Sequence, residues 1–274
     1  MSLPSEILLQ ILDRNKWNDL KTLLNCCLVN SSWLKVAQPL LFRHLGIYGR
    51  GVEESSLHNL LRSIDGRPEL ASFIHFLQLQ HLTRFNLKTL TREEKQCIAS
   101  LLSKLTNVKS INWDQVEYSQ LSKEIQQSIN GLFRLPSLVS LEIRSSTHPS
   151  ALDFLLAISG AANLQTLHIS RFRFDQIHDT RISSPDEILS PPDSIPLTAL
   201  GLNHTDISSF VELFSDVTCP FSFRSLDTLY LVCSSWYPPD TPDCNTLDVL
   251  LELIGPNIKH FTFQLSHGAM TIRH

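Results

Sequence analysis

Residue types that could carry catalysis occur in the sequence, but their spacing matches none of the common catalytic or phosphate-binding motifs. There is no G-x-S-x-G, no Walker loop, no G-x-G-x-x-G and no H-E-x-x-H. His178 and Asp179 are adjacent in a polar stretch, where a solvated pair on a loop is expected. We therefore expect no enzyme activity, and a hydrolase with an unrecognised site is the least favoured hypothesis.

The cysteines do not have the spacing of a ligand set. Six are present, at Cys26, Cys27, Cys97, Cys219, Cys233 and Cys244. No two of them form a C-x-x-C pair, and the chain is too long and too poor in cysteine for a disulfide scaffold. The thiols are expected to pack as small apolar side chains. The sequence thus predicts no metal, no cofactor and a reducing location, in the cytoplasm, the nucleus or both.

Composition excludes further classes of function. The net charge is −4, from 27 acidic and 23 basic residues, which argues against a nucleic-acid binder. No apolar run reaches the length of a membrane span, and no basic region leads the short apolar stretch near the N-terminus, so neither a membrane nor a signal peptide is expected. Leucine is abundant while glycine occurs only 9 times, which disfavours glycine-loop nucleotide sites and suggests repeats. A length of 274 residues suggests one large domain, or a small domain joined to a larger one.

The first 45 residues have the pattern of three short helices. Apolar positions 7, 8, 11 and 12 form a stripe on the first. Asn18 can cap the second, and Asn30 can cap the third, which carries Trp33 and is followed by Pro39. Helices this short cannot bury all their apolar groups among themselves, so some should face another domain or another protein.

The apolar residues of this segment follow a specific order. They read Leu3-Pro4-x-Glu6-Ile7, Ile11-Leu12, Leu20, Leu23-Leu24, Cys27-Leu28-Val29, Trp33 and Pro39-Leu40-Leu41-Phe42. This order resembles an F-box, in the form common in fungal F-box proteins. The family implies a trihelical module that docks on a Skp-type adaptor, which links it to a cullin and a ubiquitin-conjugating enzyme. Matched to the motif, the adaptor-binding residues would be Leu3, Pro4, Ile7, Ile11, Leu12, Leu24, Val29 and Trp33. Burial statistics alone would favour a core role for such residues, so the ordered match carries this prediction.

The rest of the chain repeats the pattern apolar-x-x-apolar-x-apolar. Seven copies are spaced 26 to 34 residues apart, at Ile74-Leu77-Leu79, Val108-Ile111-Trp113, Leu138-Leu141-Ile143, Leu164-Leu167-Ile169, Leu197-Leu200-Leu202, Leu226-Leu229-Leu231 and Ile258-Phe261-Phe263. The last two apolar positions of each copy share one face of a strand. Polar residues such as Glu142 and His168 alternate with them, which predicts that the other face is solvated.

Amphipathic helices are predicted before six of these seven strands. Their apolar residues recur at helical spacing within 57–64, 98–105, 121–132, 152–156, 207–214 and 247–254. The strand at Leu197 is the exception, because a polar and proline-rich stretch precedes it. A unit of one strand and one helix has a single apolar face and must stack on its neighbours to bury it.

The Leu-x-x-Leu-x-Leu strands resemble those of leucine-rich repeats. The resemblance implies an irregular α/β solenoid of strands and helices, with helices on the convex side. The asparagine that usually follows the strand is missing in every copy, at Leu82, Val116, Ser146, Phe172, Thr205, Ser234 and Ser266, so other groups must satisfy the backbone there. A doubly wound α/β sheet is the rival architecture, but its strands would be more continuously apolar than these.

Two proline-containing stretches, 175–196 and 234–246, are predicted to be loops. Insertions in repeat proteins often emerge on the binding face, although an inert surface loop is the commoner case. Trp236 and Tyr237 in the second stretch are candidate anchors for a partner, because exposed aromatic residues often supply binding energy.

These patterns predict an F-box at residues 1–47 and a leucine-rich-repeat-like domain at 48–274. The chain would be the substrate-recognition subunit of a Skp-cullin-F-box type ubiquitin ligase, with a protein target whose identity the sequence does not specify. Its target-facing strand positions would be Asn112, Asp114, Glu142, Arg144, His168, Tyr230 and Thr262. A scaffold of the same fold outside any ligase is the alternative. The chain ends soon after Phe263 with no polar capping unit, as expected of a fragment or an incomplete gene model.

Overall fold

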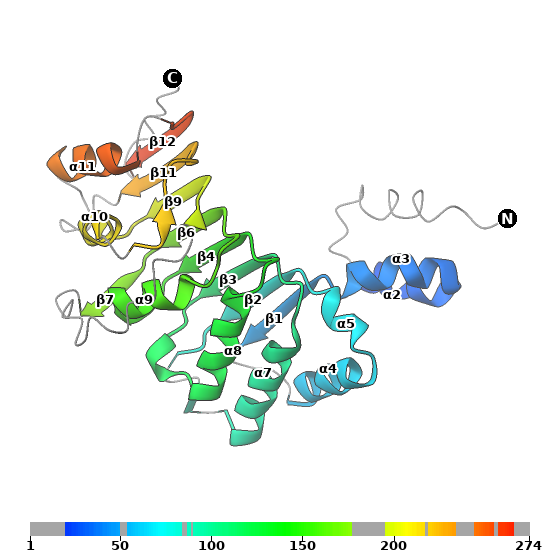
Figure 1. Ribbon diagram of the computed structural model, residues 1–274. Helices are drawn as coiled ribbons and strands as arrows, with labels where there is room; N and C mark the ends of the chain where they lie inside the picture. Colours follow the sequence, from blue (N-terminus) through cyan, green and yellow to red (C-terminus); the bar gives the residue numbers. More distant parts are fainter. Residues whose placement is uncertain are drawn as a thin grey trace.

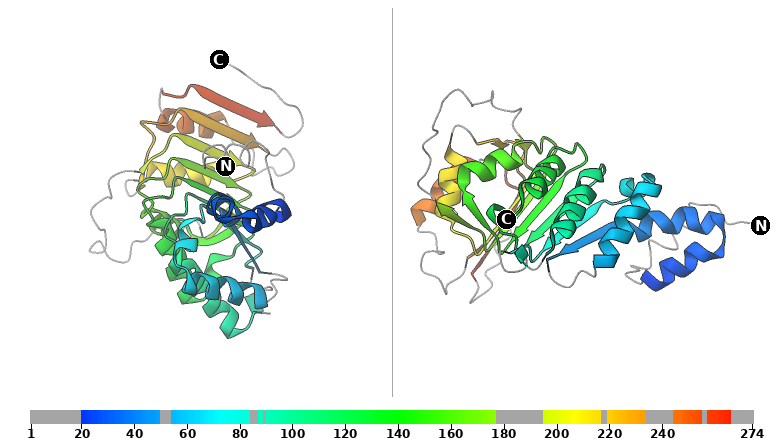
Figure 2. Two further views of the ribbon diagram at one scale, coloured as in Figure 1. Left: turned by 90° about the vertical axis from the view of Figure 1, so that its right-hand side faces the viewer. Right: turned by 90° about the horizontal axis from the view of Figure 1, so that it is seen from below.

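The computed structural model describes residues 20–49, 54–83, 87–88, 90–176, 195–216, 219–233, 244–254 and 257–265. Within these ranges it is a mixed α/β protein built on one eight-stranded parallel sheet (Figure 1). Two helices lie beyond the first strand of this sheet, and the other helices lie along one of its faces (Figures 1 and 2).

The strands of the sheet follow one another in the order of the chain. They are β1 (His44–Tyr48), β2 (Phe76–Gln80), β3 (Ser110–Asp114), β4 (Ser140–Arg144), β6 (Thr166–Ser170), β9 (Ala199–Asn203), β11 (Thr228–Cys233) and β12 (His260–Leu265). All seven predicted strands are present, and their apolar positions are in register from Leu77 on β2 to Phe261 on β12. A doubly wound sheet would reverse its strand order at a switch point, and these eight strands contain no such reversal.

β1 is a strand that the sequence analysis did not predict. Phe42-x-x-Leu45-x-Ile47 is an eighth copy of the strand pattern, but it lies inside the segment assigned to the F-box. Leu45 and Ile47 are buried in the main core, and β1 pairs with β2 along its whole length. The end of the N-terminal module is therefore also the first strand of the sheet.

One face of the sheet is covered by helices and the other is open. The covering elements are α4 (Glu54–Gly66), α5 (Glu69–Ser72), α7 (Arg92–Lys104), η1 (Tyr118–Gln120), α8 (Lys123–Phe133), α9 (Ala151–Ile158), α10 (Ile207–Ser215) and α11 (Cys244–Ile254). Helices stand at all six predicted positions. Burial alternates along β2, β3, β4 and β6, so every second side chain joins the core and the others lie on the open face.

Side-chain caps fix where several helices begin. At α7, Thr91 and Glu94 form a capping box in which each side chain accepts a hydrogen bond from the other's backbone N–H. Ser122 caps α8 by accepting a hydrogen bond from the Ile125 N–H, and Asp206 caps α10 by accepting one from the Ser208 N–H. These caps end each preceding loop at a defined residue.

The two predicted loops are shorter than expected, because strands and a helix extend into their predicted ranges. Asp175 and Gln176 belong to β7 (Arg173–Gln176), which pairs with β5 (Thr147–Ser150), and residues 195–196 form β8 (Ile195–Pro196), which pairs with β10 (Phe221–Ser222). Ile195 is fully buried, so packing overrides the polar and proline-rich character of its neighbours. Likewise, α11 begins at Cys244 within the predicted loop 234–246. Residues 177–194 and 234–243, with Trp236 and Tyr237, lie outside the described residues.

The same tight turn follows five of the strands. His81, Gln115, Ser145, Arg171 and His204 each have positive φ, between 47° and 56°. Each of their backbone N–H groups donates to a carbonyl at the end of the next strand, as Ser145 does to Ser170 at 2.8 Å. The chain then turns inward, and the following residues Leu82, Val116, Ser146, Phe172 and Thr205 are buried. These are the positions where the sequence lacks asparagine.

Ser146 supplies one of the missing backbone contacts at such a position. Its hydroxyl donates to the carbonyl of Arg144 at 2.7 Å and accepts from the N–H of Val116 at 3.2 Å. It thereby connects the turns after β3 and β4. A small hydroxyl side chain can thus satisfy two backbone groups in a turn that is otherwise closed by apolar packing.

The N-terminal helices form a separate small core. α2 (Leu20–Val29) and α3 (Ser31–Leu41) pack through Leu23, Val36 and Ala37. Asn30 caps α3 as predicted, because its side chain accepts from the N–H groups of Ser32 and Trp33. α3 is longer than predicted and continues through Pro39 to Leu41, although the proline has no N–H to donate to the carbonyl of Lys35. The first predicted helix lies outside the described residues.

Candidate protein-interaction surfaces

An apolar stripe is exposed on α2. Leu20, Leu24 and Leu28 recur every four residues and are 60%, 46% and 84% exposed, and Val29 beside them is 60% exposed. Residues at this spacing lie on one side of a helix. Leu23, which lies beside this stripe, is buried and packs on α3. Contiguous large apolar side chains that are exposed often mark a protein-interaction site.

The predicted adaptor-binding residues divide into three groups. Leu24 and Val29 belong to the exposed stripe of α2. Trp33 is partly buried and packs against the small core of α2 and α3, so it supports the helix pair from within. The remaining predicted residues, Leu3, Pro4, Ile7, Ile11 and Leu12, lie outside the described residues.

The predicted target-facing residues all lie on strands of the sheet, at the positions that point to its open face. Asn112 and Asp114 are on β3, Glu142 and Arg144 on β4, and His168 on β6, each partly or fully exposed. Tyr230 on β11 and Thr262 on β12 occupy matching register positions. Sequence alternation alone therefore identified side chains of the open face, and their role in target binding stays a prediction.

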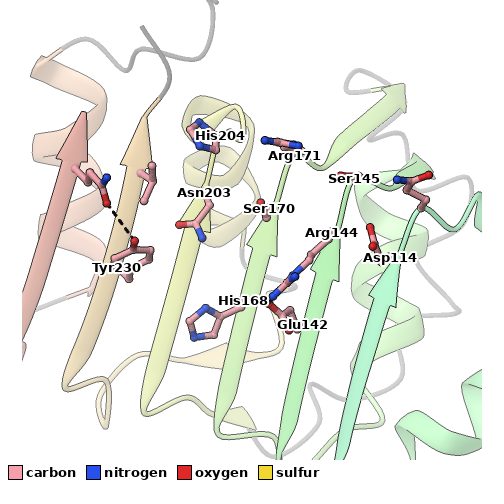
Figure 3. A pocket seen from close by; sticks show the side chains of 13 residues that line it. Asp114, Glu142, Arg144, Ser145, His168, Ser170, Arg171, Asn203, His204 and Tyr230 are labelled. Atoms are coloured by element: carbon pink, nitrogen blue, oxygen red, sulfur yellow. Dashed lines mark hydrogen bonds and ion pairs between the residues drawn. The ribbon is translucent and has the colours of Figure 1, made fainter. Parts of the chain in front are cut away.

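Five of these residues line one depression on the open face. It encloses about 540 Å³ at the carboxyl ends of the strands from β3 to β12 (Figure 3). Its lining includes Asp114, Glu142, Arg144, His168 and Tyr230. Asn112 and Thr262 are not among its lining residues. Since the depression is open and mostly polar, it suits a segment of another macromolecule better than a small apolar ligand.

Hydrogen bonds join three of the predicted residues. The Asn112 side-chain amide donates to Glu142 Oε2 at 3.0 Å, and Arg144 Nε donates to Glu142 Oε1 at 2.7 Å. Arg144 Nη2 donates to the same carboxylate oxygen. The negative charge of Glu142 is thus compensated within the protein, in a partly exposed setting where solvent weakens each ion pair.

Other residues of the depression were missed from the sequence. Ser145, Ser170, Arg171, Asn203 and His204 also line it. Ser170 and Asn203 share the register of Arg144, so the strand alternation could have identified them. Ser145, Arg171 and His204 occupy the positive-φ turns, where alternation breaks and no glycine signals the turn.

A close contact on the open face links His168 to Gly201. The two residues are register partners on β6 and β9. A Cβ atom at position 201 would lie 2.5 Å from His168 Nδ1. The imidazole therefore occupies the space that a side chain at this position would fill, and Gly201 makes room for it.

No arrangement of metal ligands was found in the part of the chain that the structure describes. No group of three His, Cys, Asp or Glu side chains there could hold a metal ion. Burial raises the pKa of the Cys97 and Cys219 thiols, which keeps both protonated at neutral pH and disfavours nucleophilic chemistry. Among the described helices, none is both long and apolar enough to cross a membrane.

Comparison with known proteins identifies the N-terminal part of the chain. Residues 1–48 match the F-box-like family model. Within the described residues, the match covers α2, α3 and β1 and stops at the last residue of β1. A search of curated proteins found no significant match. The chain thus carries an F-box-like domain whose end is built into the eight-stranded sheet.

Proposed function

We propose that this chain is the substrate-recognition subunit of a Skp-cullin-F-box type ubiquitin ligase. Its F-box-like domain would bind a Skp-type adaptor, which in turn binds a cullin, and the sheet domain would bind the target protein. The observation that carries the proposal is the F-box-like match at residues 1–48 together with the exposed apolar stripe of α2.

The sheet domain suits the second role. We interpret residues 48–274 as an irregular, leucine-rich-repeat-like solenoid. This interpretation is supported by parallel strands in chain order, helices along one face and a recurring turn after the strands. Such an arrangement leaves a wide polar face of side chains from many strands, and surfaces of this kind bind extended or folded protein partners.

The proposed role is binding and not chemistry. A substrate-recognition subunit holds its target near the conjugating enzyme and raises the effective concentration of target lysines there. No enzyme activity or cofactor is therefore needed in the chain itself. The cytoplasm and the nucleus are the proposed locations, and the fungal form of the F-box remains a prediction from the sequence.

Co-purification with a Skp-type adaptor tests the adaptor half of the proposal. Leu24→Asp and Leu28→Asp place a carboxylate in the exposed stripe of α2 without touching its packed side, so adaptor capture should fall by about tenfold or more while thermal unfolding is unchanged. Trp33→Ala should weaken capture as well, but with a lower melting temperature, because Trp33 packs inside the helix pair.

Leu251→Asp is the matched control for these variants. Leu251 is also an exposed leucine on a helix, α11, at the other end of the molecule, so this change should leave adaptor capture intact. If wild-type chain captures no adaptor, or if the α2 variants capture as much as Leu251→Asp, the ligase assignment is wrong. The scaffold alternative would then hold, provided that the open face still binds a partner.

A further inference from the structure

The charged groups of the open-face depression are not equally available to a ligand. Glu142 is already occupied by Arg144 and Asn112. For Arg171 and Asp114, by contrast, the structure shows neither an ion pair nor a side-chain hydrogen bond to any described residue. The depression therefore offers one available cation and one available anion.

The backbone holds Arg171 firmly in place. It has φ of 50° in the turn after β6, and its N–H donates to the carbonyl of Asn203 at 2.8 Å. Its side chain is exposed and lines the depression. Ser145 and His204 occupy the same position in the turns after β4 and β9, so a hydroxyl and an imidazole flank Arg171 in one row (Figure 3). This row can donate several hydrogen bonds to one anionic group.

Asp114 provides the opposite charge at a fixed separation. It is the last residue of β3, and β4 lies between β3 and β6 in the sheet. Adjacent strands are about 4.8 Å apart, so the ends of β3 and β6 are separated by roughly 10 Å. Side chains two or four residues apart lie on the same face of an extended peptide and are about 7 or 13 Å apart, so these two spacings bracket this distance.

We propose that the depression binds an extended, mixed-charge segment of a target protein, with a carboxylate facing Arg171 and a lysine or arginine facing Asp114. This inference rests on the proposed function, for which it names the kind of target. A carboxylate fits better than a phosphate, because the unpaired Asp114 would repel the second negative charge of a phosphate. Tyr230 and Val232, which line the depression toward β11, offer an aromatic and an apolar contact for a residue beside the charged pair.

Synthetic peptides of defined charge test the proposal against the full chain bound to its adaptor. The probe is a set of fluorescein-labelled twelve-residue peptides with one glutamate and one lysine placed one to six residues apart in a neutral background. Matched sets carry glutamine in place of both residues, or phosphoserine in place of glutamate. Fluorescence anisotropy at low salt measures the affinities, because exposed ion pairs weaken as salt rises.

Peptides with glutamate and lysine two or four residues apart are expected to bind more tightly than neutral ones. Arg171→Gln and Asp114→Asn should each weaken that binding by about fivefold. The matched controls Arg224→Gln and Asp248→Asn remove the same charges at exposed positions before β11 and on α11, and should have no effect. The double reversal Arg171→Glu, Asp114→Lys should prefer peptides with the order of the two charges exchanged.

Three results would overturn the inference. These are equal affinity for neutral and mixed-charge peptides, unchanged affinity in Arg171→Gln and Asp114→Asn, or tighter binding of the phosphoserine set than of the glutamate set. Adaptor capture is measured on the same preparations. A chain that captures the adaptor but not the peptides refutes this inference and leaves the proposed ligase role intact, whereas a chain that fails to capture the adaptor refutes that role.

Discussion

At the scale of single residues, the structure shows how turns without asparagine are satisfied. In each turn after β2, β3, β4, β6 and β9, one backbone N–H donates a hydrogen bond to a carbonyl of the next strand. The side chain that follows is buried. The side chains at the five inward positions differ in type, and among these five only Ser146 forms hydrogen bonds to two backbone groups. This makes Ser146 the residue where a small change has a large expected effect.

Ser146→Ala should destabilise the fold. The variant removes the acceptor of the buried Val116 N–H, whereas the Arg144 carbonyl keeps its hydrogen bond from the Gln115 N–H. Leaving the Val116 N–H unsatisfied costs about 1–3 kcal/mol of unfolding free energy. Urea denaturation followed by circular dichroism measures the loss. Ser225→Ala, at an exposed serine before β11, is the control and should stay within about 0.5 kcal/mol of wild type; a similar value for both variants would show that water satisfies the turn.

At the scale of elements, apolar periodicity predicted most of the fold. Seven strands and six helices stand where alternation and helical spacing put them, because each element buries one face and leaves the other polar. β1 escaped prediction although Phe42, Leu45 and Ile47 fit the strand pattern, because these residues were assigned to the end of the helical module.

The candidate site was predicted only in part, for a related reason. Alternation identifies side chains on regular strands, such as Glu142 and His168. It fails at Arg171 and His204, which lie in left-handed turns that usually carry glycine. Without a glycine, the sequence has no local signal for the turn, and the row of turn residues along the rim of the depression becomes visible only once the strands are in register.

Gly131 in α8 offers a stabilising change at this scale. It is exposed inside the helix, and a Cβ atom added there would meet nothing within 4 Å. Gly131→Ala should raise the unfolding free energy by about 0.5–1 kcal/mol, because alanine loses less backbone entropy in a helix. Thermal and urea unfolding measure the gain. Gly201→Ala is the contrasting variant, since its Cβ would collide with the ring of His168, and it should not stabilise.

At the scale of the whole molecule, the F-box-like domain and the sheet meet in a cluster of basic and aromatic side chains. The ring of His44 stacks on Phe76 at 4.6 Å, and the Arg43 guanidinium lies 5.1 Å from the centre of the same Phe76 ring. His75 Nε2 accepts a hydrogen bond from the Asn107 side chain at 3.1 Å, which requires an unprotonated nitrogen. Burial lowers the pKa of both histidines below the usual 6.5, and the positive charges of Arg43 and Lys109 lower it further at His75.

Acid should therefore loosen the junction between the two parts. As the pH falls through 6.5, the unfolded chain binds protons at His44 and His75 that the folded chain does not, so stability present above this pH decreases below it. Melting temperatures at pH 7.5, 6.5 and 5.5 measure the effect. The double variant His44→Gln, His75→Gln should lose less stability on acidification than wild type does, whereas His260→Gln, at an exposed position on β12, should behave like wild type. An unchanged pH dependence in the double variant would exclude this junction as the source.

The direct passage from α3 into β1 gives the molecule a mechanical property. Only Phe42 and Arg43 separate the helix from the strand, and the Arg43 carbonyl accepts hydrogen bonds from His75 and Phe76 at 3.0 Å each. A rotation of the sheet relative to α3 would therefore be centred on the residues beside α3. Seven strand spacings of about 4.8 Å place the far edge roughly 34 Å from these residues, so a tilt of about 10° there would displace that edge by about 6 Å. A small change of backbone angle at the two residues after α3 would therefore move the far edge of the open face most.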